Sequence, residues 1–184
     1  MGYTKTFRFD DISLNSDVTL VNNITDFIIQ RVPDAQILFC ISPMVNNECG
    51  ERVFPSKFHA FADHRKFFNV DKIGVPVGLH SAATFAGHGL VHVDHRLLSK
   101  ELQEFSILTS CAISKCKTFV PPFNKWNKYT EEICNEHGIK LVKFEDGWLS
   151  AEHNAYNSSH ALWYLHSYEW TLDKIVDWFN NKVL

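Results

Sequence analysis

The stretch Gly87-His88-Gly89-Leu90-Val91-His92-Val93-Asp94-His95-Arg96 decides how the rest of the chain is interpreted, because it gathers three histidines and one aspartate. Histidine is the commonest metal-ligating side chain, through a neutral ring nitrogen. His88 and His92 lie four residues apart, a spacing that lets two side chains converge on a helix or around a tight turn, which Gly89 makes easy. The stretch predicts two ligands of a divalent metal, although the pair alone also fits surface or hydrogen-bonded histidines.

An acidic pair near the N-terminus is expected to supply the third ligand. Residues 5–10 alternate polar and apolar side chains, which predicts a strand with Asp10 and Asp11 at its C-terminal end. Adjacent side chains point to opposite faces of a regular strand, but a turn at its end can direct both into one pocket. We predict that Asp11 binds the metal and that Asp10 stays available as a base.

Strands and helices alternate along the chain. Apolar runs and alternation predict strands over residues 5–10, 36–42, 82–86, 118–120, 140–144 and 161–165. Helical spacing predicts helices from residue 18, capped by Asp17, and over residues 100–114, 130–137 (capped by Thr130) and 171–181. This order indicates an α/β fold with a mostly parallel sheet or barrel, in one domain that spans residues 1–184.

Residues 43–80 fit no regular pattern, because prolines, glycines and asparagines interrupt them. The segment nevertheless contains five phenylalanines, so we expect a folded excursion that covers one end of the sheet, with helical residues around Phe61–Phe68.

Composition narrows the functional classes. The chain has 184 residues, 45% hydrophobic and 21% charged, and a net charge of −3. These values are typical of a globular domain and give no indication of a nucleic-acid partner. No apolar run is long enough to cross a membrane. The five cysteines are irregularly spaced, and the N-terminus has no apolar signal core, so we expect reduced, mostly buried thiols in a cytoplasmic protein.

Several polar residues fall where predicted strands end: Asp10, Asp11, His88, Pro122, Phe123 and His166. In parallel α/β folds the functional site forms at the C-terminal ends of the strands. This shared position predicts that these residues meet.

Their chemistry predicts a hydrolase. Asp11, His88 and His92 would leave coordination positions open, as catalytic zinc sites do. Asp10 could take a proton from the attacking water, and the Phe123 N–H could stabilise a developing oxyanion. His166 could protonate the leaving group, with Asp146 to orient it. A further set is predicted to contact a sugar substrate: Asn124, Trp126, Trp148 and Tyr164.

Five motifs resemble, in order, those of the polysaccharide deacetylases, a family of NodB-homology carbohydrate esterases. They are Phe9-Asp10-Asp11, His88-Gly89-Leu90-Val91-His92, Pro121-Pro122-Phe123, Asp146-Gly147-Trp148 and Leu165-His166. The resemblance implies a distorted (β/α) barrel and metal-dependent removal of acetyl groups from sugars or related small amides. It assigns the roles given above to Asp10, Phe123 and His166, with zinc as the usual metal.

The chain departs from the family pattern at three places. Val120 stands where the family usually has an arginine that tunes the base. Gly147 separates Asp146 from Trp148, and Asn124 replaces a common glycine. Candidates to replace the missing arginine are Arg8, Arg65 and Arg96. These departures indicate a divergent branch, similar to proteins of phages and surface-polysaccharide loci.

Three other interpretations stay open. A protein that keeps the fold and the metal could bind sugars without turnover. A metallo-β-lactamase-like hydrolase is suggested by His92-Val93-Asp94-His95, but its motif needs a histidine where Leu90 stands. An inert structural protein would bind no metal.

Overall fold

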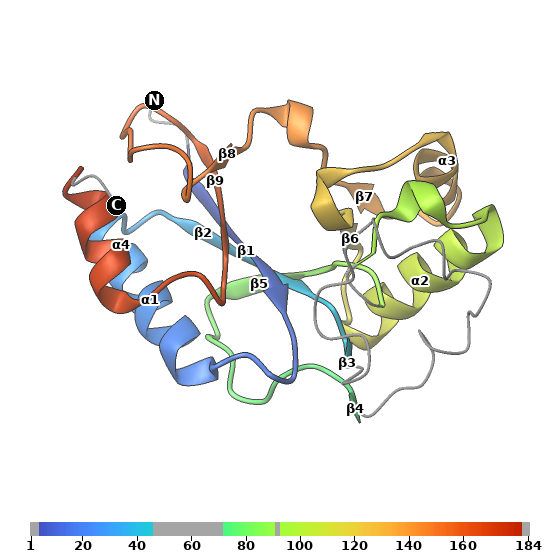
Figure 1. The fold of residues 1–184 in the computed structure, drawn as a ribbon, viewed down its shortest axis with the longest axis horizontal. Helices are drawn as coiled ribbons and strands as arrows, with labels where there is room; N and C mark the ends of the chain where they lie inside the picture. The colour runs from blue at the N-terminus through green and yellow to red at the C-terminus, as the bar shows by residue number, and fades with distance from the viewer. Residues whose placement is uncertain (1–3, 46–71, 91–92, 182–184) are drawn as a thin grey trace.

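The computed structural model describes residues 4–45, 72–90 and 93–181. Its main sheet has seven strands in the order β7-β6-β5-β2-β1-β9-β8, and every pairing is parallel. The strands are β1 (Thr6–Ile12), β2 (Gln36–Ile41), β5 (Ala83–Gly87), β6 (Thr118–Phe119), β7 (Lys140–Leu141), β8 (Leu149–Ser150) and β9 (Leu162–His166). The sheet curls into an open half-barrel with β7 and β8 at its edges (Figure 1). The predicted distorted barrel of parallel strands is confirmed.

Helices cover the convex side of the sheet in two pairs. α1 (Val18–Arg31) packs with α4 (Leu172–Phe179), and α2 (Lys100–Ile113) packs with α3 (Lys128–Glu136), on opposite flanks of the molecule (Figure 1). The short 3-10 helices are η3 (His95–Leu97), η4 (Pro122–Asn124) and η5 (Phe144–Asp146). β3 (Met44–Val45) and β4 (Lys72–Ile73) make a separate antiparallel pair.

Local side chains explain where the helices begin. The Asp17 carboxylate accepts a hydrogen bond from the Leu20 N–H, as the sequence predicts. The predicted cap of α3 is wrong: Asn127 caps it, and Thr130 is the third helical residue. The two residues form a capping box, in which the Asn127 side chain accepts from the Thr130 N–H and the Thr130 hydroxyl accepts from the Asn127 N–H. Thr130 therefore lies inside the first turn of the helix.

Other differences arise where strands are too short to show a pattern. The strand expected over residues 140–144 ends at Leu141, and η5 begins at Phe144. β8 has two residues and was not predicted. The expectations for His92 and for helical residues around Phe61–Phe68 lie outside the described residues.

The two faces of β1 have different chemistry. Phe7 and Phe9 point to the large core under α1 and α4. Arg8 and Asp10 alternate with them, so they point into the half-barrel, and both are buried. An apolar cluster that includes Cys40, Ala86, Val120, Val142 and Trp148 lines this interior.

The cysteines in the described part of the chain agree with the expected free, mostly buried thiols. Cys40, Cys111, Cys116 and Cys134 are free, and three of them are buried. Among the described helices, none combines the length and the apolar character needed to span a bilayer.

Replacing Gly87 with alanine should destabilise the fold by about 1–3 kcal/mol, a typical cost of overpacking. The added methyl would lie 2.8 Å from the Ser110 Oγ and 2.9 Å from the Cys111 Sγ. Urea denaturation measures the loss. In a Ser110→Ala, Cys111→Ala background the loss should shrink, because the two atoms are removed. An equal loss in both backgrounds would contradict this explanation.

Candidate active site

A β-bulge in β1 interrupts the regular alternation of side chains at the two aspartates. Between the pairs Phe9↔Phe39 and Ile12↔Ile41, β1 advances three residues while β2 advances two. The extra residue falls at Asp10-Asp11, and Asp11 takes a left-handed backbone with φ 61°. A bulge changes the direction of one side chain in an otherwise alternating strand. This is the turn that the sequence required for both carboxylates to face one site.

Asp11 meets His88, which follows β5 directly. Their Oδ1 and Nε2 atoms are 3.4 Å apart, and both side chains are buried. The other ring nitrogen, Nδ1, lies 2.8 Å from the Val120 carbonyl oxygen and donates its N–H there. This bond fixes the tautomer that leaves Nε2 with a lone pair, as in many metal sites.

This geometry fits a tetrahedral metal ion. Two ligand atoms that each lie about 2.0–2.1 Å from a tetrahedral ion are roughly 3.3–3.4 Å apart. The observed separation of Asp11 Oδ1 and His88 Nε2 is 3.4 Å. The donor set of one carboxylate and one imidazole suits zinc. The predicted third ligand, His92, is outside the described part of the chain, so its position stays a prediction.

Asp10 is held by Arg8, two residues earlier on the same face of β1. Arg8 Nε lies 2.8 Å from Asp10 Oδ1, and Nη2 lies 2.7 Å from Oδ2. The same Nη2 donates to Asn124 Oδ1 at 2.7 Å. Of the three arginines proposed to replace the missing one, Arg8 therefore contacts Asp10. Arg96 instead pairs with Asp94, and Arg65 lies outside the described residues.

Two of the predicted sugar-stacking rings contact Arg8 instead. The guanidinium carbon lies 4.7 Å from the Trp148 ring centre and 4.8 Å from that of Tyr164. Trp148 is buried, so it cannot present a face to a sugar. Trp126 is half-buried, with Lys143 Nζ 5.9 Å from its ring centre, and stays a candidate substrate contact.

The loop after β6 is backbone-strained. Phe123 and Asn124 have φ of 57° and 54°, in the left-handed region that non-glycine residues rarely adopt. Together with Asp11 they make three of the five such residues in the described ranges. Strained conformations of this kind cluster at functional sites. The use of the Phe123 N–H as an oxyanion donor stays a prediction. The Asn124 side chain accepts a hydrogen bond from Arg8.

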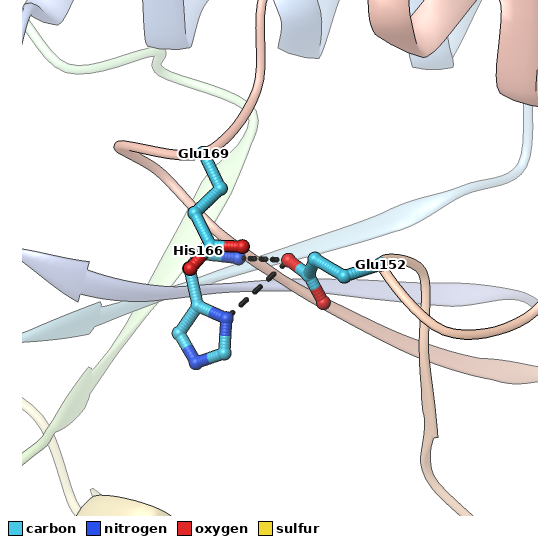
Figure 2. Close-up of side chains that lie close together, drawn as sticks. All are labelled: Glu152, His166 and Glu169. Carbon is cyan, nitrogen blue, oxygen red and sulfur yellow. Dashed lines mark hydrogen bonds and ion pairs between the residues drawn. The ribbon is translucent and has the colours of Figure 1, made fainter. Parts of the chain in front are cut away.

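His166 ends β9 opposite Asp10 in the parallel register. Figure 2 shows Glu152 reaching it from the turn after β8: Glu152 Oε1 lies 3.3 Å from His166 Nδ1 and accepts the His166 backbone N–H at 2.7 Å. Asp146, which the sequence suggested for this role, is exposed in η5, where it accepts a hydrogen bond from the Lys143 N–H. The predicted pairing of Asp146 with His166 is therefore wrong.

Glu152 and His166 shift each other's pKa. Burial alone would lower the pKa of His166, but the contact with Glu152 and the nearby aspartates raise it to about 8 from 6.5. Burial alone would raise the pKa of Glu152, but its contact with His166 and other donors lower it to about 2 from 4.5.

These shifts link the site to the stability of the fold. Protonated His166 stabilises the fold fully below about pH 6.5, and this contribution is lost as the pH rises through about 8. Ionised Glu152 stabilises it fully above about pH 4.5, and that contribution is lost as the pH falls through about 2.

His166 also belongs to a second group of residues whose types can bind a metal. The ligand atoms of Glu152, His166 and Glu169 lie within 4.8 Å of one another (Figure 2). However, both carboxylate oxygens of Glu152 already accept hydrogen bonds. Its Oε1 also accepts from the Trp170 indole at 2.8 Å, and its Oε2 accepts from the Ser150 hydroxyl at 2.6 Å. We therefore regard Glu152 as a hydrogen-bonded partner of His166 rather than a metal ligand.

Two residues at this site carry no sequence signal. Glu152 lies in an irregular turn, at no fixed spacing from any motif, and only the fold brings it to His166. Tyr168 is 43% exposed, and its ring centre lies 5.6 Å from that of His166, with the planes inclined by 33°. It offers the flat, accessible surface that was expected of Trp148.

Comparisons with known proteins identify the fold. No family model matches the sequence, and no curated protein matches it. Among solved structures, a family 4 carbohydrate esterase from Streptomyces lividans, in complex with acetate, is similar with a TM-score of 0.53 and 13% identity, over 96% of this chain and 84% of that one. A family 4 pseudoenzyme from Bacillus anthracis gives 0.55 and 11%, over 95% and 59%. The Bc1960 peptidoglycan N-acetylglucosamine deacetylase gives 0.52 and 12%, over 90% and 72%.

The chain therefore has the fold of the family 4 carbohydrate esterases, the polysaccharide deacetylases that its motifs resemble. At these sequence identities the similarity concerns the fold alone. One of the similar structures is that of a pseudoenzyme.

Replacing Glu152 with glutamine should lower the pKa of His166 below about 8, because burial is then opposed by Asp10 and Asp11 without the Glu152 carboxylate. Histidine NMR titration of the metal-free protein measures the shift. Asp146→Asn is the matched control and should leave the pKa of His166 unchanged. A pKa that stays near 8 in the Glu152→Gln protein would contradict the assigned contact.

Proposed function

We propose that this protein is a metal-dependent hydrolase that removes the acetyl group from an acetylated amino sugar or a related amide. The observation that carries the proposal is the contact between Asp11 Oδ1 and His88 Nε2, which are 3.4 Å apart. Asp10, which is paired with Arg8, precedes Asp11 in the same strand. Asp11 and His88 lie at the C-terminal end of the half-barrel, as does His166. The fold shared with deacetylases supports the same chemistry.

Asp11, His88 and His92 are the proposed ligands, and zinc is the proposed metal. A bound zinc ion would lower the pKa of a water molecule and polarise the acetyl carbonyl. The site is buried, which strengthens electrostatic interactions within it.

The remaining groups then have complementary roles. Asp10 accepts a proton from the water as its oxygen bonds to the acetyl carbon. The Phe123 N–H donates to the carbonyl oxygen as negative charge develops there. His166, kept protonated near neutral pH by Glu152, donates a proton to the leaving nitrogen as the carbon–nitrogen bond breaks. Acetate and the free amine are the products.

A binding protein without turnover is the second candidate. Val120 in place of the usual arginine favours it, and so does the structural likeness to a pseudoenzyme. This candidate keeps the metal and the sugar site but releases no acetate. The two candidates are therefore separated by an activity assay, not by metal binding.

The purified protein should contain about one zinc ion per chain, as expected for one three-ligand site. Asp11→Asn, His88→Ala and His92→Ala should each lose it, measured by elemental analysis after dialysis with the fold checked by circular dichroism. His80→Ala is the control, because the His80 ring pairs with Asp26 at the surface. Stoichiometric zinc in a folded His88→Ala protein would eliminate the proposed centre.

Zinc-loaded protein should release acetate from oligomers of N-acetylglucosamine, and a chelator should abolish the release. Asp10→Asn should keep its zinc but lose about 10²–10⁴-fold in rate, the usual contribution of a positioned base. Asp26→Asn, an exposed carboxylate, is the control. Zinc uptake without acetate release from N- or O-acetylated sugars would favour the binding protein.

A further inference from the structure

Arg8 is a charged side chain with no exposed surface inside the half-barrel. Burying a charge is costly unless it is paired and hydrogen-bonded. Arg8 donates two parallel bonds to the Asp10 carboxylate, at 2.8 and 2.7 Å. A bidentate contact of this kind fixes the plane of the carboxylate as well as its position. Asp10 is therefore hydrogen-bonded to an arginine of its own strand, β1.

The same guanidinium also reaches the strained loop. Its Nη2 donates to Asn124 Oδ1 at 2.7 Å, and Asn124 directly follows Phe123. One side chain thus connects the proposed base on β1 with the loop that carries the proposed oxyanion donor. Both loop residues have positive φ, so the loop needs a contact that holds this conformation.

Aromatic rings fix the guanidinium itself. Trp148, next to β8, and Tyr164, on β9, lie with ring centres 4.7 and 4.8 Å from it. Cation–π contacts of this type favour arginine over lysine, whose ammonium is a compact, strongly hydrated charge. Arg8 therefore has little freedom to move away from Asp10.

Val120 belongs to the same interior. It is fully buried, and it packs in one apolar cluster with Trp148, the residue that covers Arg8. An arginine at position 120 would start from the apolar cluster that contains Trp148, the ring against which Arg8 lies. The two positions are thus alternatives for placing one guanidinium in the barrel.

We propose that Arg8 is a positioning residue that orients Asp10 and the Phe123–Asn124 loop together, in place of the arginine missing at position 120. The inference rests on the proposed function for its catalytic meaning. Its structural content is separate: the carboxylate and the loop should lose their common orientation when the guanidinium is removed.

The test compares zinc-loaded Arg8→Met, Arg8→Lys and the double variant Arg8→Met, Val120→Arg with the wild type. Arg8→Met should lower kcat for acetate release by about 100-fold, a loss typical of a misplaced group, with KM changed less than about threefold. Arg8→Lys should restore little, because it cannot bind in a bidentate manner. Val120→Arg should recover about tenfold or more of the loss, which restored packing alone would not do.

Arg31→Met is the matched control, since Arg31 is exposed at the end of α1 and should not affect kcat. Zinc content should be the same in all variants. A folded Arg8→Met protein within threefold of the wild-type kcat would overturn the proposal, and so would the absence of any recovery in the double variant.

A second measurement separates this inference from the proposed function. Acetohydroxamate, a metal chelator with polar hydrogens that can reach the base, should bind the zinc-loaded Arg8→Met protein about tenfold or more weakly than the wild type. If the wild type releases no acetate but shows this difference, the deacetylase proposal fails and the positioning role stands. Equal binding in both proteins overturns the positioning role. A wild type that takes up no zinc overturns both.

Discussion

The bulge in β1 is the constraint on which the site depends. In a regular strand the side chains of Asp10 and Asp11 would lie on opposite faces, one inside the half-barrel and one against the helices. One extra residue before Ile12, with Asp11 in a left-handed conformation, brings Asp11 to His88 while Asp10 stays with Arg8. The apolar face of β1 still packs against α1 and α4. The fold therefore accommodates the site through a local change in one strand.

The interior of the half-barrel is correspondingly specialised. Such interiors are usually filled by branched apolar side chains. Here apolar packing surrounds a guanidinium that is hydrogen-bonded on two sides and covered by two aromatic rings. A second carboxylate, that of Glu152, lies partly buried beside His166 with donors on both oxygens. Each of these charges faces an opposite one, Asp10 for Arg8 and His166 for Glu152. Arg8 Nη1 has no hydrogen-bond partner among the described residues.

Long, periodic segments were predictable from the sequence. Residues 18–31 show a clear helical face, and residues 36–41 form an apolar strand, so the parallel unit around β1 followed from pattern alone. The meeting of Asp11 and His88 also followed, because both stand at strand ends. The two-residue strand β8 and the turn that carries Glu152 show no periodicity, so only the tertiary fold reveals them. Arg8 was one of three candidates, and choosing among them required knowledge of which face of β1 lines the interior of the half-barrel.

We propose that Asp11 and His88 share one metal ion at the C-terminal end of the half-barrel. Anomalous X-ray diffraction from crystals grown with zinc, recorded on both sides of the zinc absorption edge, tests it directly. A shared zinc ion should give one strong peak about 2.0–2.2 Å from an Asp11 carboxylate oxygen and from His88 Nε2. A peak among Glu152, His166 and Glu169 instead, or no bound zinc at all, would contradict it.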